Sequence, residues 1–136
     1  LIQNLDNVKR IDNIDLDEKS IKVFKKYRWE TQDRKRLDGR VADVRTPHKS
    51  DIGTDIVINT SSEHMPNLKE NIKNKEYKPE CLFALQSNNM IHVVDHINCV
   101  NDEQELIDKS ELSKVVYRGS LDMPNGYTRF MAIGYV

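Results

Sequence analysis

Side chains capable of acid–base chemistry or ligand binding follow directly after one apolar run of the sequence. The run IVI, over residues 56–58, leads into the polar sequence NTSSEH over residues 59–64. Histidine is the side chain best suited to accept a proton near neutral pH, and a neighbouring carboxylate can assist it. We therefore consider Glu63 and His64 as catalytic candidates. The plainer interpretation of His64 is a structural histidine.

A second polar group lies between residues 88 and 96. Asn88 and Asn89 follow the apolar run CLFAL, and His92, Asp95 and His96 come shortly after. We assign Asn88, Asn89 and His96 to substrate binding. Histidine and carboxylate ligands at this spacing can bind zinc or a non-haem metal, and with Glu63 or His64 added a metal-dependent hydrolase is an alternative. His92 and His96 would share a face only on a helix, and the β-branched residues between them disfavour one, so we assign no metal ligands.

Strands and helices that alternate along the chain must position these groups. The expected order is strand, helix, strand, strand, helix, strand, helix and a closing hairpin, where PNG supplies the turn. The expected ranges are 8–16, 18–36, 39–46, 54–59, 67–76, 81–85, 102–108, 114–121 and 127–135, with Asp17 and either Asn101 or Asp102 as helix N-caps. This alternation predicts an α/β fold with a mostly parallel sheet and a C-terminal antiparallel hairpin.

Composition favours one compact domain over residues 1–136. The chain is 38% hydrophobic and 32% charged, with a net charge of −1, so its overall charge does not support a nucleic-acid or membrane partner. A local charge of +5 over residues 18–40 is read as a solvated helix face, with a phosphate-contacting patch as the alternative. Without a signal peptide or disulfide framework in the sequence, we expect a cytoplasmic protein in which Cys81 and Cys99 are buried free thiols.

Three expected strands end in a shared pattern. The first ends in IDLD with Asp15, the second carries ADVRT with Asp43, and the third is DIVINTSSEH. In open α/β sheets the ligand binds outside the carboxyl ends of the strands. This pattern resembles the class I S-adenosylmethionine-dependent methyltransferases, and NTSSEHM, LQSNN and HINCV together resemble a subgroup of methyltransferase-like proteins.

The resemblance implies a three-layer, Rossmann-like sheet and a methyl transfer from S-adenosylmethionine to an unknown acceptor. It implies that Asp15 binds the ribose hydroxyls and that Leu16 lies against the adenine. Asp43 would meet the adenine amino group. The segment 59–64 would face the transferring methyl group, with Asn59 and Ser61 as cofactor-binding residues. The plainer alternatives are a capping cluster for Asp15, a turn acid for Asp43 and loop hydrogen bonds for Asn59 and Ser61.

The sequence departs from the family at its beginning. No glycine-rich GxGxG loop is present, and the chain starts with Leu1 in what reads as the last turn of a helix. We therefore expect a truncated domain that lacks the family's first strand and binds the cofactor weakly. In the family's order, the strand that ends at Asp15 corresponds to the second strand and the strand over residues 54–59 to the fourth. We expect these two strands to pair directly with each other, or another chain to pair with the exposed sheet edges as in a homo-oligomer. A non-catalytic Rossmann-like interaction module is the alternative function.

Overall fold

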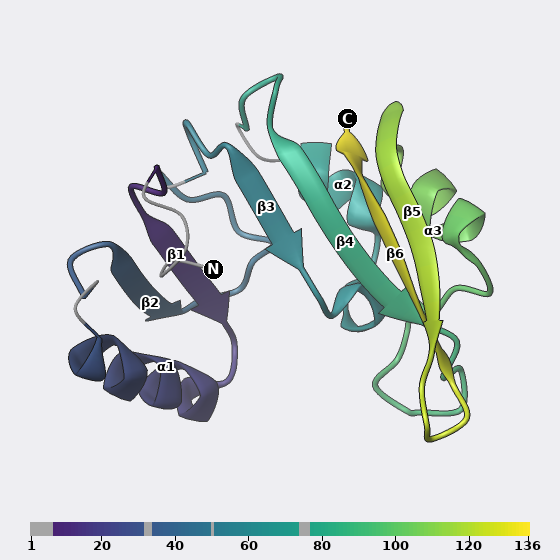
Figure 1. Ribbon diagram of the computed structural model, residues 1–136, viewed down its shortest axis with the longest axis horizontal. Coiled ribbons are helices and arrows are strands. Elements are labelled where there is room, and N and C mark those ends of the chain that lie inside the picture. The colour runs from purple at the N-terminus through teal and green to yellow at the C-terminus, as the bar shows by residue number, and fades with distance from the viewer. Residues whose placement is uncertain (1–6, 32–33, 50, 74–76) are drawn as a thin grey trace. The chain divides into compact units, whose positions relative to one another are not determined.

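The computed structural model describes residues 7–31, 34–49, 51–73 and 77–136. The chain divides into two compact units, Leu1–Pro47 and His48–Val136, and each unit is described by itself (Figure 1). No helix in the described ranges combines the length and the apolar composition needed to cross a membrane.

Among its described residues, the first unit has two parallel strands and one helix. Strand β1 (Ile11–Asp15) pairs in parallel with β2 (Leu37–Val41), and helix α1 (Glu18–Glu30) connects them. Asp17 caps α1 as expected, because its carboxylate accepts hydrogen bonds from the backbone nitrogens of Lys19 and Ser20. Ile21 of α1 is fully buried, so the helix covers one face of this sheet.

Three ranges predicted for the first unit are wrong at their ends. Strand β1 covers residues 11–15 rather than 8–16. Helix α1 ends at Glu30 rather than near residue 36, and β2 covers residues 37–41 rather than 39–46. Basic side chains at residues 34–36 allow a helix, but Arg36 O already accepts the backbone hydrogen bond of Ile11 at the start of the strand pair. The helical turn expected over residues 1–5 lies outside the described residues.

The second unit contains a four-stranded sheet in the order β3-β4-β6-β5. Strand β3 (Ile56–Asn59) pairs in parallel with β4 (Leu82–Asn88). β4 pairs antiparallel with β6 (Thr128–Tyr135), and β6 pairs antiparallel with β5 (Lys114–Asp122). The expected C-terminal hairpin is therefore confirmed, and Gly126 takes the positive φ of its turn. The expectation of a mostly parallel sheet is wrong for this unit, because two of its three described strand pairings are antiparallel.

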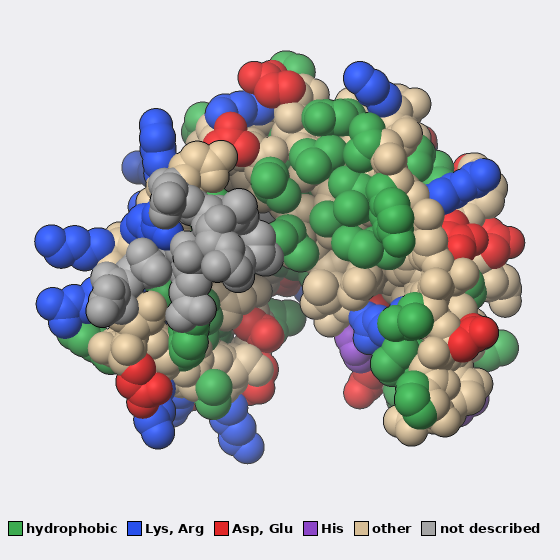
Figure 2. All heavy atoms as spheres, in the orientation of Figure 1, with side chains coloured by type: hydrophobic (Ala, Val, Ile, Leu, Met, Phe, Trp, Pro, Cys, Tyr) green, Lys and Arg blue, Asp and Glu red, His purple; other side chains and the backbone are tan. Residues whose placement is uncertain are grey.

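The described α-helices of the second unit, α2 and α3, cover the same face of this sheet. Leu68 of α2 (Leu68–Lys73) and Leu106 of α3 (Glu103–Ser110) pack in one core with Phe83, Leu85 and Phe130. On the opposite face no helix among the described elements of this unit covers the strands. Figure 2 shows hydrophobic side chains gathered there, with the two helices behind the sheet in Figure 1. A three-layer arrangement is thus not seen within this unit.

Strand β4 is longer than predicted, and this changes the setting of the candidate site. It extends to Asn88 rather than ending at Leu85, because residues 86–88 continue the antiparallel ladder opposite Met131, Phe130 and Arg129. The expected direct pairing between β1 and β3, which correspond to the family's second and fourth strands, is wrong. The two strands belong to different sheets. Pairing of their edges with another chain stays a prediction.

Gly134 in β6 tests the register of the hairpin. A Cβ atom at this position would lie 2.6 Å from the backbone oxygen of Lys114, and that carbonyl belongs to the paired strand β5. Because backbone cannot rotate away as a side chain can, we expect Gly134→Ala to lower the free energy of unfolding by about 1–3 kcal/mol in urea denaturation.

Gly119→Ala is the matched control in β5. Its Cβ would approach the hydroxyl end of Tyr117, a half-exposed side chain that can move aside. We expect the control to be clearly less destabilised than Gly134→Ala. Equal losses in the two variants would contradict the register.

Candidate functional site

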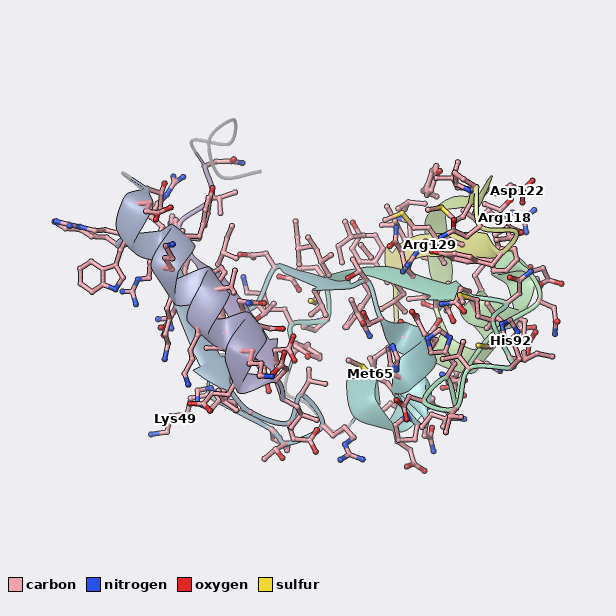
Figure 3. The ribbon with its side chains drawn as sticks, turned by 90° about the horizontal axis from the view of Figure 1, so that it is seen from below. Lys49, Met65, His92, Arg118, Asp122 and Arg129 are labelled. Atoms are coloured by element: carbon pink, nitrogen blue, oxygen red, sulfur yellow. The ribbon has the colours of Figure 1, made fainter. Side chains whose placement is uncertain are left out.

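The site is built where two parallel strands end at the same edge of the sheet. β3 is followed by a single 3-10 turn, η2 (Ser62–His64), and β4 is followed by an irregular segment over residues 89–100. A backbone hydrogen bond joins these segments, because Asn98 N donates to Glu63 O at 2.9 Å. Ser87 Oγ of β4 donates to Asn98 O at 3.1 Å and holds the irregular segment against the sheet. Figure 3 shows both segments, with Met65 labelled just after η2 and His92 in the irregular segment.

Glu63, His64 and His96 come together in this arrangement. One potential ligand atom from each of the three side chains lies within 4.8 Å of the other two. The rings of His64 and His96 meet edge to face, with centroids 4.6 Å apart. The structure therefore brings both predicted catalytic residues and one predicted substrate-binding residue into one group.

The hydrogen bond of His64 determines which tautomer its neutral ring adopts. Its Nδ1 lies 3.0 Å from the carbonyl oxygen of Asp95. A carbonyl oxygen can only accept, so the neutral imidazole carries its proton on Nδ1 and keeps its lone pair on Nε2. That nitrogen is the atom with which His64 can accept a proton or bind a ligand.

Buried polar atoms without partners surround this group. Glu63 is only 4% exposed, yet its Oε2 has no hydrogen-bond partner in the described structure. The same is true of the buried atoms His96 Nδ1, Ser62 Oγ and Asn98 Nδ2. Most buried polar groups in proteins are paired, because leaving one unpaired costs roughly 1–3 kcal/mol. These four atoms lie on two adjoining segments and are available to a polar ligand.

Asn59 and Ser61, predicted to bind the cofactor, shape the turn after β3. Asn59 Oδ1 accepts a hydrogen bond from Ser61 N at 3.0 Å, and Asn59 Nδ2 contacts Met65 Sδ at the same distance. Arg129 Nη2 of β6 donates to Thr60 O at 2.6 Å. The side chain of Ser61 makes no cap hydrogen bond and is exposed. Ser61 is therefore the more available of the two for a ligand.

Asn88 and Asn89, predicted to bind substrate, hold the start of the irregular segment. Asn88 is fully buried, and its Oδ1 accepts hydrogen bonds from Met90 N at 2.9 Å and from Cys99 Sγ at 3.5 Å. Asn89 Oδ1 accepts from Thr128 N at 2.9 Å. Through these hydrogen bonds, both side chains stabilise the backbone that follows β4. Their role in substrate binding stays a prediction.

The two cysteines are free, as expected. Cys81 is buried, and burial raises the pKa of its thiol to about 11. Cys99 is half-buried next to the site. Its pKa is raised first by burial and then by the negative charge of Glu63. Because the thiolate is the nucleophilic form, these raised pKa values disfavour either cysteine as a nucleophile.

The remaining predicted residues lie in the first unit. Asp15 ends β1, and its Oδ1 accepts a hydrogen bond from Asp17 N at 2.9 Å, so it supports the start of α1. Leu16 is 66% exposed. Both oxygens of Asp43 accept hydrogen bonds from the Arg45 guanidinium, at 2.5–2.9 Å. Binding of an adenine by Asp43 would therefore have to compete with Arg45.

Sequence reasoning missed part of the site and misplaced another part. His92 is exposed and does not belong to the Glu63–His64–His96 group. Ser62, Asn98 and Cys99 were given no individual role in the site, although Ser62 belongs to the segment 59–64 and the other two follow His96 by two and three residues. These residues belong to the site because their polar atoms are buried or half-buried beside Glu63 and His96. The sequence pattern of such a short polar segment does not reveal which side chains are buried.

Solved structures resemble this chain at low sequence identity. The N-methyltransferase NodS from Bradyrhizobium japonicum matches with a TM-score of 0.67 and 11% identity, over 92% of this chain and 72% of NodS. The PH0226 protein from Pyrococcus horikoshii matches with a TM-score of 0.65 and 13% identity, over 93% of this chain and 71% of its own. A possible exported protein from Bordetella parapertussis matches with a TM-score of 0.61 and 12% identity, over 93% of this chain and 54% of its own.

These likenesses show the fold alone. Comparison with family models and with curated proteins finds no match. The chain therefore has a methyltransferase-like α/β fold, and in that coarse form the expected resemblance is confirmed.

Helix α3 anchors the segment that carries His96. Glu105 accepts hydrogen bonds from Asn101 N at 2.8 Å and Nδ2 at 2.9 Å, and it forms an ion pair with Lys109. Lys109 also donates to Cys99 O at 2.7 Å. The backbone hydrogen bond from Asn101, followed by that from Lys109, lowers the pKa of Glu105.

Glu105→Gln should therefore destabilise the protein in a pH-dependent way. A carboxylate whose pKa is lowered by folding adds stability above its unfolded pKa of about 4.3 and loses that contribution as pH falls through the folded value. We expect the variant to lose about 1 kcal/mol of unfolding free energy at pH 7 in urea denaturation. The difference from wild type should shrink towards pH 3. A difference that is the same at both pH values would contradict the assignment.

Proposed function

We propose that this chain binds S-adenosylmethionine and transfers its methyl group to an acceptor still to be identified. The observation that supports this most is the shared fold with the N-methyltransferase NodS, together with polar residues at the carboxyl ends of β1 and β3. Ligands of open α/β sheets bind at this end of the strands. The single-domain organisation of residues 1–136 is part of the same proposal.

We assign the nucleoside of the cofactor to Asp15, Leu16 and Asp43. A carboxylate can accept both hydroxyl hydrogen bonds of a ribose, and Asp15 keeps lone pairs for this beyond the one that Asp17 N uses. The exposed side chain of Leu16 offers apolar surface to an adenine ring. Asp43 is the weaker assignment, because Arg45 already engages both of its oxygens.

We assign the methyl-transfer side to the polar segment that follows β3. Methyl transfer depends on holding the acceptor in line with the sulfonium more than on acid–base strength. Ser61 and Asn59 would provide oxygen atoms towards the cofactor, and Glu63 would favour a positive charge nearby. Nε2 of His64 is free to accept a proton where the acceptor must lose one. Asn88, Asn89 and His96 complete the proposed acceptor side.

A non-catalytic interaction module is the second candidate. The chain has no glycine-rich loop for the methionine part of the cofactor. The bare face of the four-stranded sheet, with Ile56 and Ile58 more than half exposed, also fits a protein that works through contacts. Cofactor binding separates the two candidates.

The test is a nuclear magnetic resonance titration of the isotopically labelled chain with S-adenosylhomocysteine. This method detects the weak binding that we expect without a glycine-rich loop. Chemical shifts should change at Asp15, Leu16, Asn59 and Ser61 in a saturable way. Asp15→Asn should abolish the changes, because an amide presents only one acceptor oxygen to the diol.

Asp12→Asn is the matched control in the same strand. Asp12 is paired with Arg10, at 2.8 Å, and has no proposed contact with the cofactor. Its titration should match that of the wild type. No shift changes at millimolar ligand, or changes that survive Asp15→Asn, would refute cofactor binding and favour the interaction module.

A further inference from the structure

We propose that Glu63, His64 and His96 form a binding site for a divalent transition-metal ion, with zinc as its simplest occupant. The site lies at the carboxyl ends of β3 and β4, where η2 meets the irregular segment. The inference is independent of methyl transfer, because metal binding is measured in the absence of cofactor.

The ligand set suits such an ion. Two imidazoles and one carboxylate are a recurrent donor set for zinc and for non-haem iron, and they leave at least one coordination position open. Tetrahedral zinc with bonds of about 2.1 Å holds its ligand atoms roughly 3.4 Å apart. The three candidate atoms already lie within 4.8 Å of one another, so small side-chain rotations would close the site.

The hydrogen bond of His64 orients it as a ligand. Metal-binding histidines commonly donate their second ring N–H to a carbonyl or carboxylate, which fixes the tautomer and the ring plane. Nδ1 of His64 has such a partner in Asp95 O, at 3.0 Å. Its Nε2 therefore carries the lone pair that a metal needs.

Burial of Glu63 is the second, independent observation. A carboxylate that is 96% buried pays a large desolvation cost unless a cation or donor compensates it. Among the described residues, Glu63 Oε2 has no hydrogen-bond donor and no cation as a partner. His96 Nδ1 is also buried without a hydrogen-bond partner. A bound divalent cation would compensate the carboxylate and give the group of side chains a partner.

Metal binding also restricts the chemistry of His64. One lone pair on Nε2 cannot both bind a metal ion and accept a proton. With metal bound, His64 is a ligand rather than a general base, and the open coordination position becomes the place where a water molecule or an acceptor atom can bind.

Calorimetric titration of the full 136-residue chain with zinc chloride tests the site. We expect one zinc ion per chain. Glu63→Gln and His96→Gln should each weaken binding roughly 100-fold, since each removes one of three ligands. His92→Gln is the matched control, because this exposed histidine lies on the same segment outside the group. It should bind zinc as the wild type does.

Melting temperatures show whether a variant that fails to bind zinc is still folded. Without metal, Glu63→Gln should melt at or above the wild-type temperature, because it removes an uncompensated buried charge. With zinc, the melting temperature of the wild type should rise and that of Glu63→Gln should not. Absence of stoichiometric zinc binding would overturn the proposal. Binding that persists in Glu63→Gln and His96→Gln, or that is lost equally in His92→Gln, would overturn it too.

Discussion

The parallel pairing of β3 with β4 is the constraint on which the candidate site depends. Because the two strands run in the same direction, with Ile56 opposite Leu82 and Asn59 opposite Leu85, the segments that follow them leave from one edge of the sheet. η2 and the segment carrying His96 therefore meet, and the hydrogen bond from Asn98 N to Glu63 O fixes their contact. A register slip of one residue would turn the strand's side chains to the opposite face.

The charged surface contributes little to this arrangement, whereas the buried polar group matters greatly. Exposed ion pairs such as Lys22–Glu18 and Arg10–Asp38 are each worth at most about 1 kcal/mol. Glu63, in contrast, combines near-complete burial with an oxygen that has no described partner. In the metal site that we propose, a bound cation would balance this desolvation, and His64 and His96 would supply the other two ligands.

Much of the fold follows from local patterns in the sequence. Apolar runs, the caps Asp17 and Asp102 and the turn at Gly126 predict the order of the elements and the hairpin. The end of β4 could not be predicted, because its backbone ladder continues through residues 86–88 whatever their polarity. Glu63, His64 and His96 were each recognised as functional candidates, but their assembly into one group depends on strand pairing between distant segments.

A crystal structure of the zinc-soaked protein, with diffraction data on both sides of the zinc absorption edge, tests the metal site most directly. We expect one anomalous peak bonded to Glu63, to Nε2 of His64 and to a ring nitrogen of His96, at about 2.0–2.2 Å from each. An anomalous map with no peak in this group of side chains, or with zinc bound only at exposed residues such as His92, would contradict it.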